Sequence, residues 1–438
     1  MLKLLLIPLI LLPILLMLYI GVSAFNPQLS PDFDQYFYKE NVAPKDNASF
    51  LLQGINAPEG QDLFEFATLI WDTKPERTEP FYDPNTEEEL KLVTLTEFTP
   101  NNLTFECWTS QDYEPDEHTI CATEEQIREI LTENALIMDR YTLLWPYKRF
   151  YHDTLYGFAR GQEMIQINDL RNAKLTLMAR DGQAAEALDI WIKRQNFLNM
   201  AMADGQNLVF KAIIMINYSR NLHVLPIIVS RADQETLNAH KDALDSALNV
   251  SIFGDDGFDI RATLSSEYFT VFEAEELMQY MRHPNYQKRV ISFLMYRKNA
   301  TANQFLTYAK NVLNATQLPL EHMLPTVRAS QKTFYPEISF LNMLYNPVGK
   351  LILGGTVRGA EMFDNRIAHI MHARMLRLYI DAKSHGIGAD DMPAFMHQTR
   401  DRYINDYTNK PFEWDAEKHE IYFDQGRDEF TRRYSVVY

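Results

Sequence analysis

The sequence predicts a mainly α-helical protein, and three observations support this fold class. Apolar residues recur at helical spacing through most of the chain after Thr123. Only 16 of the 438 residues are glycine, which leaves little material for β-rich turns. Gly and Pro fall between the periodic stretches and divide them into α-hairpins. We therefore expect an irregular helical array without a strict repeat, together with an N-terminal transmembrane helix and a small C-terminal β-hairpin.

Composition and charge limit the classes of partner. Hydrophobic residues make up 46% and charged residues 23% of the chain, which is ordinary for a globular protein. Lys and Arg number 42 against 59 Asp and Glu, so the formal net charge is −17. A surface of this sign disfavours nucleic acid and anionic lipid. We expect no nucleic-acid partner.

An almost unbroken apolar run, Leu4–Ala24, opens the chain. As a helix this run is long enough to cross a hydrocarbon core of about 30 Å. Lys3 is its only basic flank, which favours an N-terminus on the inner side. The tripeptide Val22-Ser23-Ala24 has the small-x-small form of a signal peptidase site, so a cleaved signal is the alternative to an anchor.

Both cysteines of the chain, Cys107 and Cys121, lie in one polar and acidic segment. An exported chain meets an oxidising compartment, where such a pair usually forms a disulfide. Chain entropy gives a loop of this length a stabilisation of roughly 3 kcal/mol. The spacing is not that of a CxxC motif, and His118 is the only soft ligand nearby. We therefore expect a structural disulfide between Cys107 and Cys121, with a redox or metal pair as the alternative.

Changes in sequence character predict four segments. Residues 1–24 form the anchor or signal, and residues 25–122 form a loop-rich segment that contains the disulfide. Residues 123–345 form the helical array. Residues 346–438 contain a long helix followed by the β-hairpin.

Helix signals are strongest within the array. Thr123-Glu124-Glu125-Gln126 has the S/T-x-x-E/Q pattern of a capping box, and apolar spacing continues from it to Trp145, just before Pro146. No period of about 34 residues recurs, which argues against a tetratricopeptide array. The other predicted helices span residues 61–71, 163–180, 184–203, 207–218, 233–248, 258–282, 302–314 and 319–332.

The C-terminal segment begins with the longest predicted helix, Pro347–Lys383, and Gly386 is placed to end it. Beyond it, residues 412–415 and 419–423 alternate apolar and polar with period two, which predicts a β-hairpin that turns over Asp415–Lys418. The apolar stripe of the long helix comprises Phe363, Ile367, Ile370, Met371, Met375 and Leu378.

Residues 405–415, Asn-Asp-Tyr-Thr-Asn-Lys-Pro-Phe-Glu-Trp-Asp, resemble the D-P-[aromatic]-[TS]-G-x-P-[FL]-x-[YW] tail of bacterial pseudopilin-like and planctomycete-type export proteins. The likeness covers at most Ile367–Phe423. Asp406 stands where Pro is usual and Asn409 where Gly is usual. Since Asn tolerates the left-handed conformation, the turn is expected to remain. The chain lacks a prepilin cleavage site and a full calcium ligand set, so it is not expected to be a pilin subunit.

The whole chain is also similar to uncharacterised membrane-anchored helical proteins of Gram-negative bacteria. This similarity implies a cellular location and a fold, but no activity. It implies a single-pass inner-membrane protein whose bulk lies in the periplasm, with residues 4–24 in the membrane.

His369 and His372 form the most metal-like feature, because positions i and i+3 of a helix share a face and His is a common metal ligand. A zinc or copper site would need a third strong ligand from elsewhere. On a helical wheel the two histidines lie roughly opposite the apolar stripe, which favours a polar face. The HExxH pattern is absent.

Other chemical signals in the sequence are weak. Nucleotide-binding loops and the nucleophile motifs of hydrolases are absent. The aromatic-rich stretch 141–156, with Lys148 and Arg149, either packs between helices or forms a recognition surface. In a chain with 59 acidic residues, carboxylate pairs arise by chance, and here they are Asp255/Asp256, Asp390/Asp391 and Glu273/Glu275/Glu276.

Together these features predict a non-enzymatic helical scaffold or adaptor of the cell envelope, acting in envelope assembly or secretion. It would bind protein or peptide partners in a groove between helices and require no cofactor. The alternative is a periplasmic hydrolase or metal-dependent enzyme centred on His369 and His372.

Overall fold

The computed structural model describes most of the chain after residue 26, and contacts divide the chain into two compact units. The predicted N-terminal helix within residues 1–24 lies outside the described residues. One unit comprises Met1–Glu40, Pro75–Glu79 and Ile260–Met362, and the other comprises Asn41–Lys74, Pro80–Asp259 and Phe363–Tyr438. The described residues are 27–37, 42–72, 93, 103–104, 120–151, 158–204, 208–253, 257–272, 298–334, 359–425 and 432–438.

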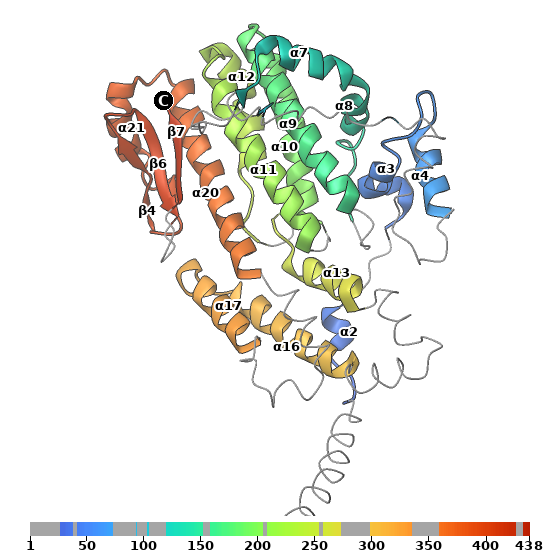
Figure 1. Cartoon of the computed structure of the whole chain (residues 1–438). Coiled ribbons are helices and arrows are strands. Elements are labelled where there is room, and N and C mark those ends of the chain that lie inside the picture. The colour runs from blue at the N-terminus through green and yellow to red at the C-terminus, as the bar shows by residue number, and fades with distance from the viewer. Residues whose placement is uncertain are drawn as a thin grey trace, which may run out of the picture. The chain divides into compact units, whose positions relative to one another are not determined.

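The smaller unit is helical and has an aromatic core. Its described helices are α2 (Phe33–Tyr36), α13 (Ile260–Phe272), α16 (Lys298–Ala315) and α17 (Leu320–Phe334) (Figure 1). Helix α16 contacts the other three. Phe37 stacks on Tyr268 with ring centroids 5.0 Å apart and on Phe305 with centroids 5.5 Å apart. Burial of these rings holds the short helix α2 against α13 and α16.

The larger unit is built on consecutive helices that pack side by side (Figure 1). Helix α10 contacts α9, α11 and α12, and α9 also contacts α11. At Gly161 in α9 an added Cβ would lie 2.2 Å from Ile213 Cδ1 of α11, so glycine permits this close approach. The helices that precede the C-terminal part are α3 (Ala48–Gln53), α4 (Leu63–Asp72), α7 (Glu124–Glu133), α8 (Ala135–Thr142), α9 (Phe158–Arg180), α10 (Ala184–Ala203), α11 (Leu208–Val229) and α12 (Gln234–Leu248).

The C-terminal part of the larger unit places one long helix between the helices and a small sheet. In Figure 1, α20 (Gly359–Ser384) lies between α11 and strands β6 and β7. The ring of His372 in α20 lies 4.8 Å from that of His223 in α11 and 5.6 Å from that of Tyr434 in β7. The three-stranded antiparallel sheet has the order β5-β6-β7 and comprises β5 (Glu413–Asp415), β6 (Glu420–Gln425) and β7 (Arg432–Val437).

Several short elements complete the described structure. The 3-10 helices η1 (Pro44–Asp46) and η3 (Ala389–Asp391) precede α3 and α21 (Met392–Gln398). Strand β3 (Ile404–Asn405) pairs antiparallel with β4 (Lys410–Pro411), and β1 (Leu103–Thr104) pairs parallel with β2 (Ile120–Cys121).

The mainly helical fold and the small C-terminal sheet are confirmed. The capping box is also confirmed, because Thr123 Oγ1 accepts from Gln126 N at 3.3 Å and Gln126 Oε1 accepts from Thr123 N at 2.8 Å. Gly386 ends α20 with a φ of 65°. Asn409 holds the turn between β3 and β4 with a φ of 52°, as its tolerance of the left-handed region predicts.

Two boundaries predicted from sequence are wrong. The helix expected to run to Trp145 is interrupted at Asn134, whose side-chain amide donates to Ile130 O at 2.9 Å and caps α7. The helix expected over 207–218 continues to Val229 with Pro226 inside it, because burial of its end outweighs the lost hydrogen bond. The predicted hairpin is confirmed as β5 and β6, and the next strand of the chain, β7, which was not predicted, pairs with β6. Residues 90–98, whose sequence also suggests a strand, lie outside the described residues except for Val93.

Helix α11 is the most apolar long helix of the larger unit. Among the residues that the structure describes, it alone has the length and mean hydropathy, 1.3, of a membrane span, but 61% of that window is buried within the protein. Two hydrogen bonds join it to α10: Trp191 Nε1 donates to Asn221 O at 2.8 Å, and Asn221 Nδ2 donates to Gln195 Oε1 at 2.7 Å. Its burial and its contacts with α9 and α10 make α11 a core helix of the larger unit.

Candidate functional site

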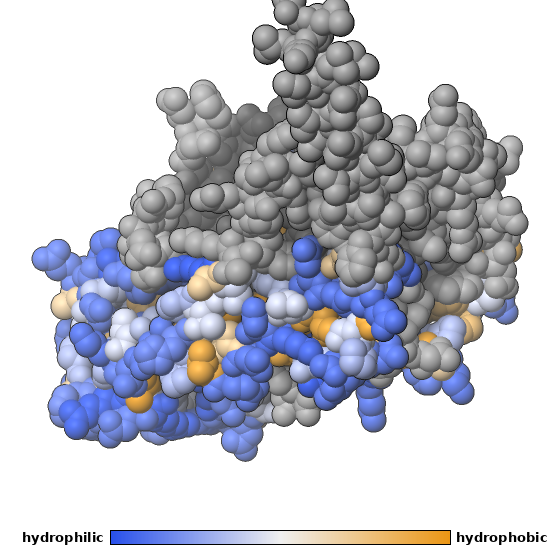
Figure 2. All heavy atoms as spheres, turned by 90° about the horizontal axis from the view of Figure 1, so that it is seen from below, coloured by the Kyte–Doolittle hydropathy of each residue, from blue (hydrophilic) through white to orange (hydrophobic). Residues whose placement is uncertain are grey.

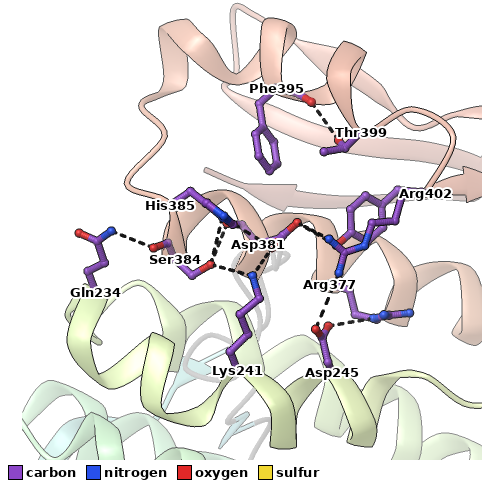
Figure 3. A network of polar contacts seen from close by, with 11 residues as sticks. Gln234, Lys241, Asp245, Arg377, Asp381, Ser384, His385, Phe395, Thr399 and Arg402 are labelled. Atoms are coloured by element: carbon purple, nitrogen blue, oxygen red, sulfur yellow. Dashed lines mark hydrogen bonds and ion pairs between the residues drawn. The ribbon is translucent and has the colours of Figure 1, made fainter.

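Figure 3 shows a network of polar contacts centred on Asp381, near the C-terminal end of α20. Its side chain is 4% exposed. Lys241 of α12 donates to Oδ1, while Arg402 Nη1 and Tyr403 OH each donate to Oδ2 at 3.1 Å. One buried carboxylate therefore joins α12, α20 and the segment that follows α21.

Opposing effects act on the pKa of Asp381. Burial pushes the pKa of this carboxyl up, whereas the hydrogen bond and charge of Lys241, with the charge of Arg402, pull it down. The net result is a pKa below the ordinary value for Asp. Burial, followed by the neighbouring charge of Asp381, raises the pKa of Tyr403. At neutral pH the site is therefore an ionised carboxylate held by two cations and a neutral phenol.

Hydrogen bonds on either side of Asp381 extend this network. Asp245 of α12 accepts from Arg377 Nε at 3.1 Å, and Arg377 Nη1 donates to Asn249 Oδ1 at 2.8 Å. Gln234 Nε2 donates to Ser384 O at 2.8 Å, at the end of α20. The whole set, Gln234, Lys241, Asp245, Arg377, Asp381, Ser384, Arg402 and Tyr403, is called the Asp381 clamp below.

Ser384, His385 and Asp381 bring together the residue types of a hydrolytic triad, but their geometry is that of a helix end. His385 Nδ1 lies 3.5 Å from Ser384 Oγ and 3.6 Å from Asp381 Oδ1, so one ring nitrogen faces both groups. A triad needs the two ring nitrogens to serve the serine and the carboxylate separately. Moreover, Ser384 Oγ donates to Asp381 O at 2.8 Å. These contacts cap the helix and do not activate a nucleophile.

The expectation of a polar face at His369 and His372 is wrong. The two side chains are 6% and 1% exposed. His369 stacks on Tyr218 of α11 with ring centroids 6.0 Å apart, and His372 packs between His223 and Tyr434. The helical wheel failed because α20 is covered on one side by α11 and on the other by the sheet. Within the described ranges, no group of three or more His, Cys, Asp or Glu is placed to hold a metal ion.

The other residues predicted from the sequence lie partly within and partly outside the described residues. Cys121 ends β2 and is not a free cysteine, while Cys107 lies outside the described residues, so the bond between them stays a prediction. Asp390 and Asp391 are exposed in η3. Tyr141, Phe150 and Tyr151 are buried, which confirms the packing interpretation for these members of the aromatic stretch. The acidic pairs Asp255/Asp256 and Glu273/Glu275/Glu276 lie outside the described residues.

Sequence reasoning missed a set of buried cations in the larger unit: Arg171, Arg194, Lys211 and Arg366. Lys211 Nζ donates to the carbonyls of Met202 and Asp204 and so caps the C-terminal end of α10. Burial lowers the pKa of Lys211 to about 7, against the opposing charges of Asp204 and Asp259. The sequence signal was Lys and Arg within helical stretches whose other positions are apolar.

The chain has no match among protein-family models, curated proteins or solved structures.

Proposed function

We propose that the protein is an extracytoplasmic helical scaffold or adaptor of the envelope, anchored by residues 4–24, that binds protein or peptide partners. The observation that carries this proposal is an apolar stripe on the outer side of α11. Val209 and Ile216 are 46% and 40% exposed. They stand at positions i and i+7, on one face, with the half-buried Ala212 between them.

The stripe has the form that helix-in-groove or helix-on-helix recognition uses, since the i, i+3 and i+7 positions of one face supply apolar contacts. Figure 2 shows one face of the molecule, on which the described surface is mainly hydrophilic and apolar residues form small patches. Small apolar areas in a polar surround suit a protein or peptide better than a lipid surface. The net charge of −17 also favours a partner that is not anionic.

The Asp381 clamp supports a scaffold role in a second way. It joins α12, α20 and the segment before the C-terminal sheet through charge-assisted hydrogen bonds. Such bonds are shorter and stronger than neutral ones. They hold the elements of the larger unit in one arrangement, which limits the entropy lost when a partner binds.

A photo-crosslinking amino acid at Ile216 tests the binding role. We expect irradiation of intact cells to give crosslinked products of discrete mass, because the stripe contacts a partner directly. The matched control carries the same amino acid at Lys193, which is exposed on α10. An Ile216→Asp variant should lose the partner in co-purification while remaining folded by circular dichroism. Equal product patterns at positions 216 and 193 would contradict the proposal.

The compartment is tested separately. We expect a reporter enzyme fused after Tyr438 to be active only in the extracytoplasmic compartment, because residues 4–24 carry the chain across the membrane. Cys107 and Cys121 should then resist alkylation until a reductant is added. A cytoplasmic reporter signal, or two freely alkylated thiols in cells, would contradict the extracytoplasmic location. Neither result would affect the binding experiment.

A further inference from the structure

We infer that the larger unit binds a small inorganic anion between α8, α9 and α10, at the N–H groups of Arg171, Arg194 and Asn168. This site is distinct from the proposed partner stripe on α11. Both arginines are buried, their hydrogen-bond partners are neutral, and several of their N–H groups and those of Asn168 and Trp145 lack partners among the described residues.

Both guanidinium groups are withdrawn from solvent. Arg194 is 1% exposed, and the side chain of Arg171 is 5% exposed. Removing a charged group from water is costly unless an opposite charge replaces the lost hydration. Since the guanidinium group keeps its proton under ordinary conditions, this cost is not avoided by neutralisation.

The hydrogen-bond partners of both guanidinium groups are neutral. Arg194 Nη2 donates to the side-chain oxygens of Asn168 and, at 2.9 Å, of Asn172. Arg171 Nη2 donates to the carbonyl of Met138, and its guanidinium carbon lies 5.4 Å from the centre of the Trp145 ring. These contacts satisfy individual N–H groups without supplying a negative charge.

Nearby carboxylates compensate little of this charge. Asp139 Oδ1 lies 3.9 Å from Arg171 Nη2, but its side chain is 73% exposed and stays hydrated. Asp169 also acts on Arg194 through its charge, yet Arg220 bonds directly to that carboxylate. The two buried guanidinium groups act on each other as like charges, and both act on the pKa of Tyr141, which they lower against the larger effect of burial. The region therefore keeps an excess of positive charge.

In the part of the chain that the structure describes, both arginines, Asn168 and Trp145 each carry an unpartnered nitrogen atom. Among the described residues, the buried atoms Arg194 Nη1, Arg171 Nε, Asn168 Nδ2 and Trp145 Nε1 have no hydrogen-bond partner. Each is an N–H donor, and Asn168 is oriented by the bond that its oxygen accepts from Arg194. A water molecule would supply an acceptor without a charge, whereas an anion supplies both. A site lined by guanidinium, amide and indole N–H groups suits chloride or phosphate.

Thermal unfolding of the full chain in detergent tests the inference. The midpoint is measured by circular dichroism at constant ionic strength, while sodium gluconate is replaced by sodium chloride in one series and by sodium phosphate in another. Gluconate is too large for a buried site. We expect the midpoint to rise by several degrees and to saturate in at least one series, because a ligand that binds only the folded state stabilises it. The series that saturates identifies the anion.

An Asn168→Asp variant provides the decisive comparison, since it places a carboxylate oxygen where the unpartnered amide nitrogen now lies. We expect this variant to have a higher midpoint than the wild type in gluconate and no response to chloride or phosphate. Asn196→Asp, the same change at an exposed position of α10, should keep the response of the wild type. A wild-type midpoint that is identical in all three salts would overturn the inference, and so would a full anion response in Asn168→Asp.

Discussion

An Asp381→Asn variant is expected to lose about 1–3 kcal/mol of the free energy of unfolding, the range for losing hydrogen bonds to a charged group. The 4% exposed carboxylate lies between Lys241 and Arg402, and the amide removes the negative charge that both cations contact. Urea denaturation followed by circular dichroism measures the change. Asp401→Asn is the matched control, because the Asp401 side chain is 95% exposed and should change stability by less than about 0.5 kcal/mol. Equal midpoints for the two variants would contradict the clamp.

The same variant is expected to change the response to acid. The pKa of Asp381 is lower in the folded chain than in the unfolded chain, where it is about 4. Its contribution to stability is therefore complete above pH 4 to 5 and is lost as the pH falls through the folded pKa. Between pH 5 and pH 3 the wild type should lose more stability than Asp381→Asn. Parallel curves for the two proteins would show that this carboxylate does not titrate as proposed.

A Lys211→Met variant is expected to remove a rise in stability between pH 7 and pH 9. Burial lowers the pKa of Lys211 to about 7 in the folded chain, whereas the unfolded chain keeps a pKa of about 10.5. Between these values the unfolded state binds more protons, so the free energy of unfolding increases with pH. The limiting slope is about 1.4 kcal/mol per pH unit. Urea denaturation at pH 7, 8 and 9 measures it.

The slope separates this effect from simple loss of packing. Lys211→Met also removes the bonds to the Met202 and Asp204 carbonyls, which shifts stability by a similar amount at every pH. The charges of Asp204, Asp259 and Arg366 act on Lys211 in the wild type and remain in the variant. Lys193→Met, at an exposed site of α10, should keep the wild-type slope. An unchanged slope in Lys211→Met would show that Lys211 is not the group that titrates.

Much of the secondary structure could be predicted because its signals are local. Residues 184–203 have the apolar spacing of a helix, and α10 spans Ala184–Ala203. Gly386 and Thr123 mark a helix end and a helix start through the backbone and side-chain chemistry of single positions. Local signals placed the end of α11 too early, before Pro226. The helix continues past this proline because its end is buried against its neighbours, and that gain depends on the packing of the whole unit.

The polar sites could not be predicted from the sequence. Lys241 and Asp381 are 140 positions apart, and neither carries a local mark of the partner. His369 and His372 have the spacing of a polar face, yet the sheet and α11 cover them from two sides. The buried arginines Arg171 and Arg194 sit on stretches that look like ordinary amphipathic helices, where a cation is expected to reach solvent.

By itself the sequence determined the helical class of this protein, most of its helix boundaries and the C-terminal hairpin, because backbone propensity, capping and apolar period act within a few residues of each other. Only the tertiary structure decided which polar side chains are enclosed, which charges meet and which N–H groups lack acceptors. Those properties depend on the distance between segments that are far apart in the chain, and burial makes each unmatched charge costly enough to matter.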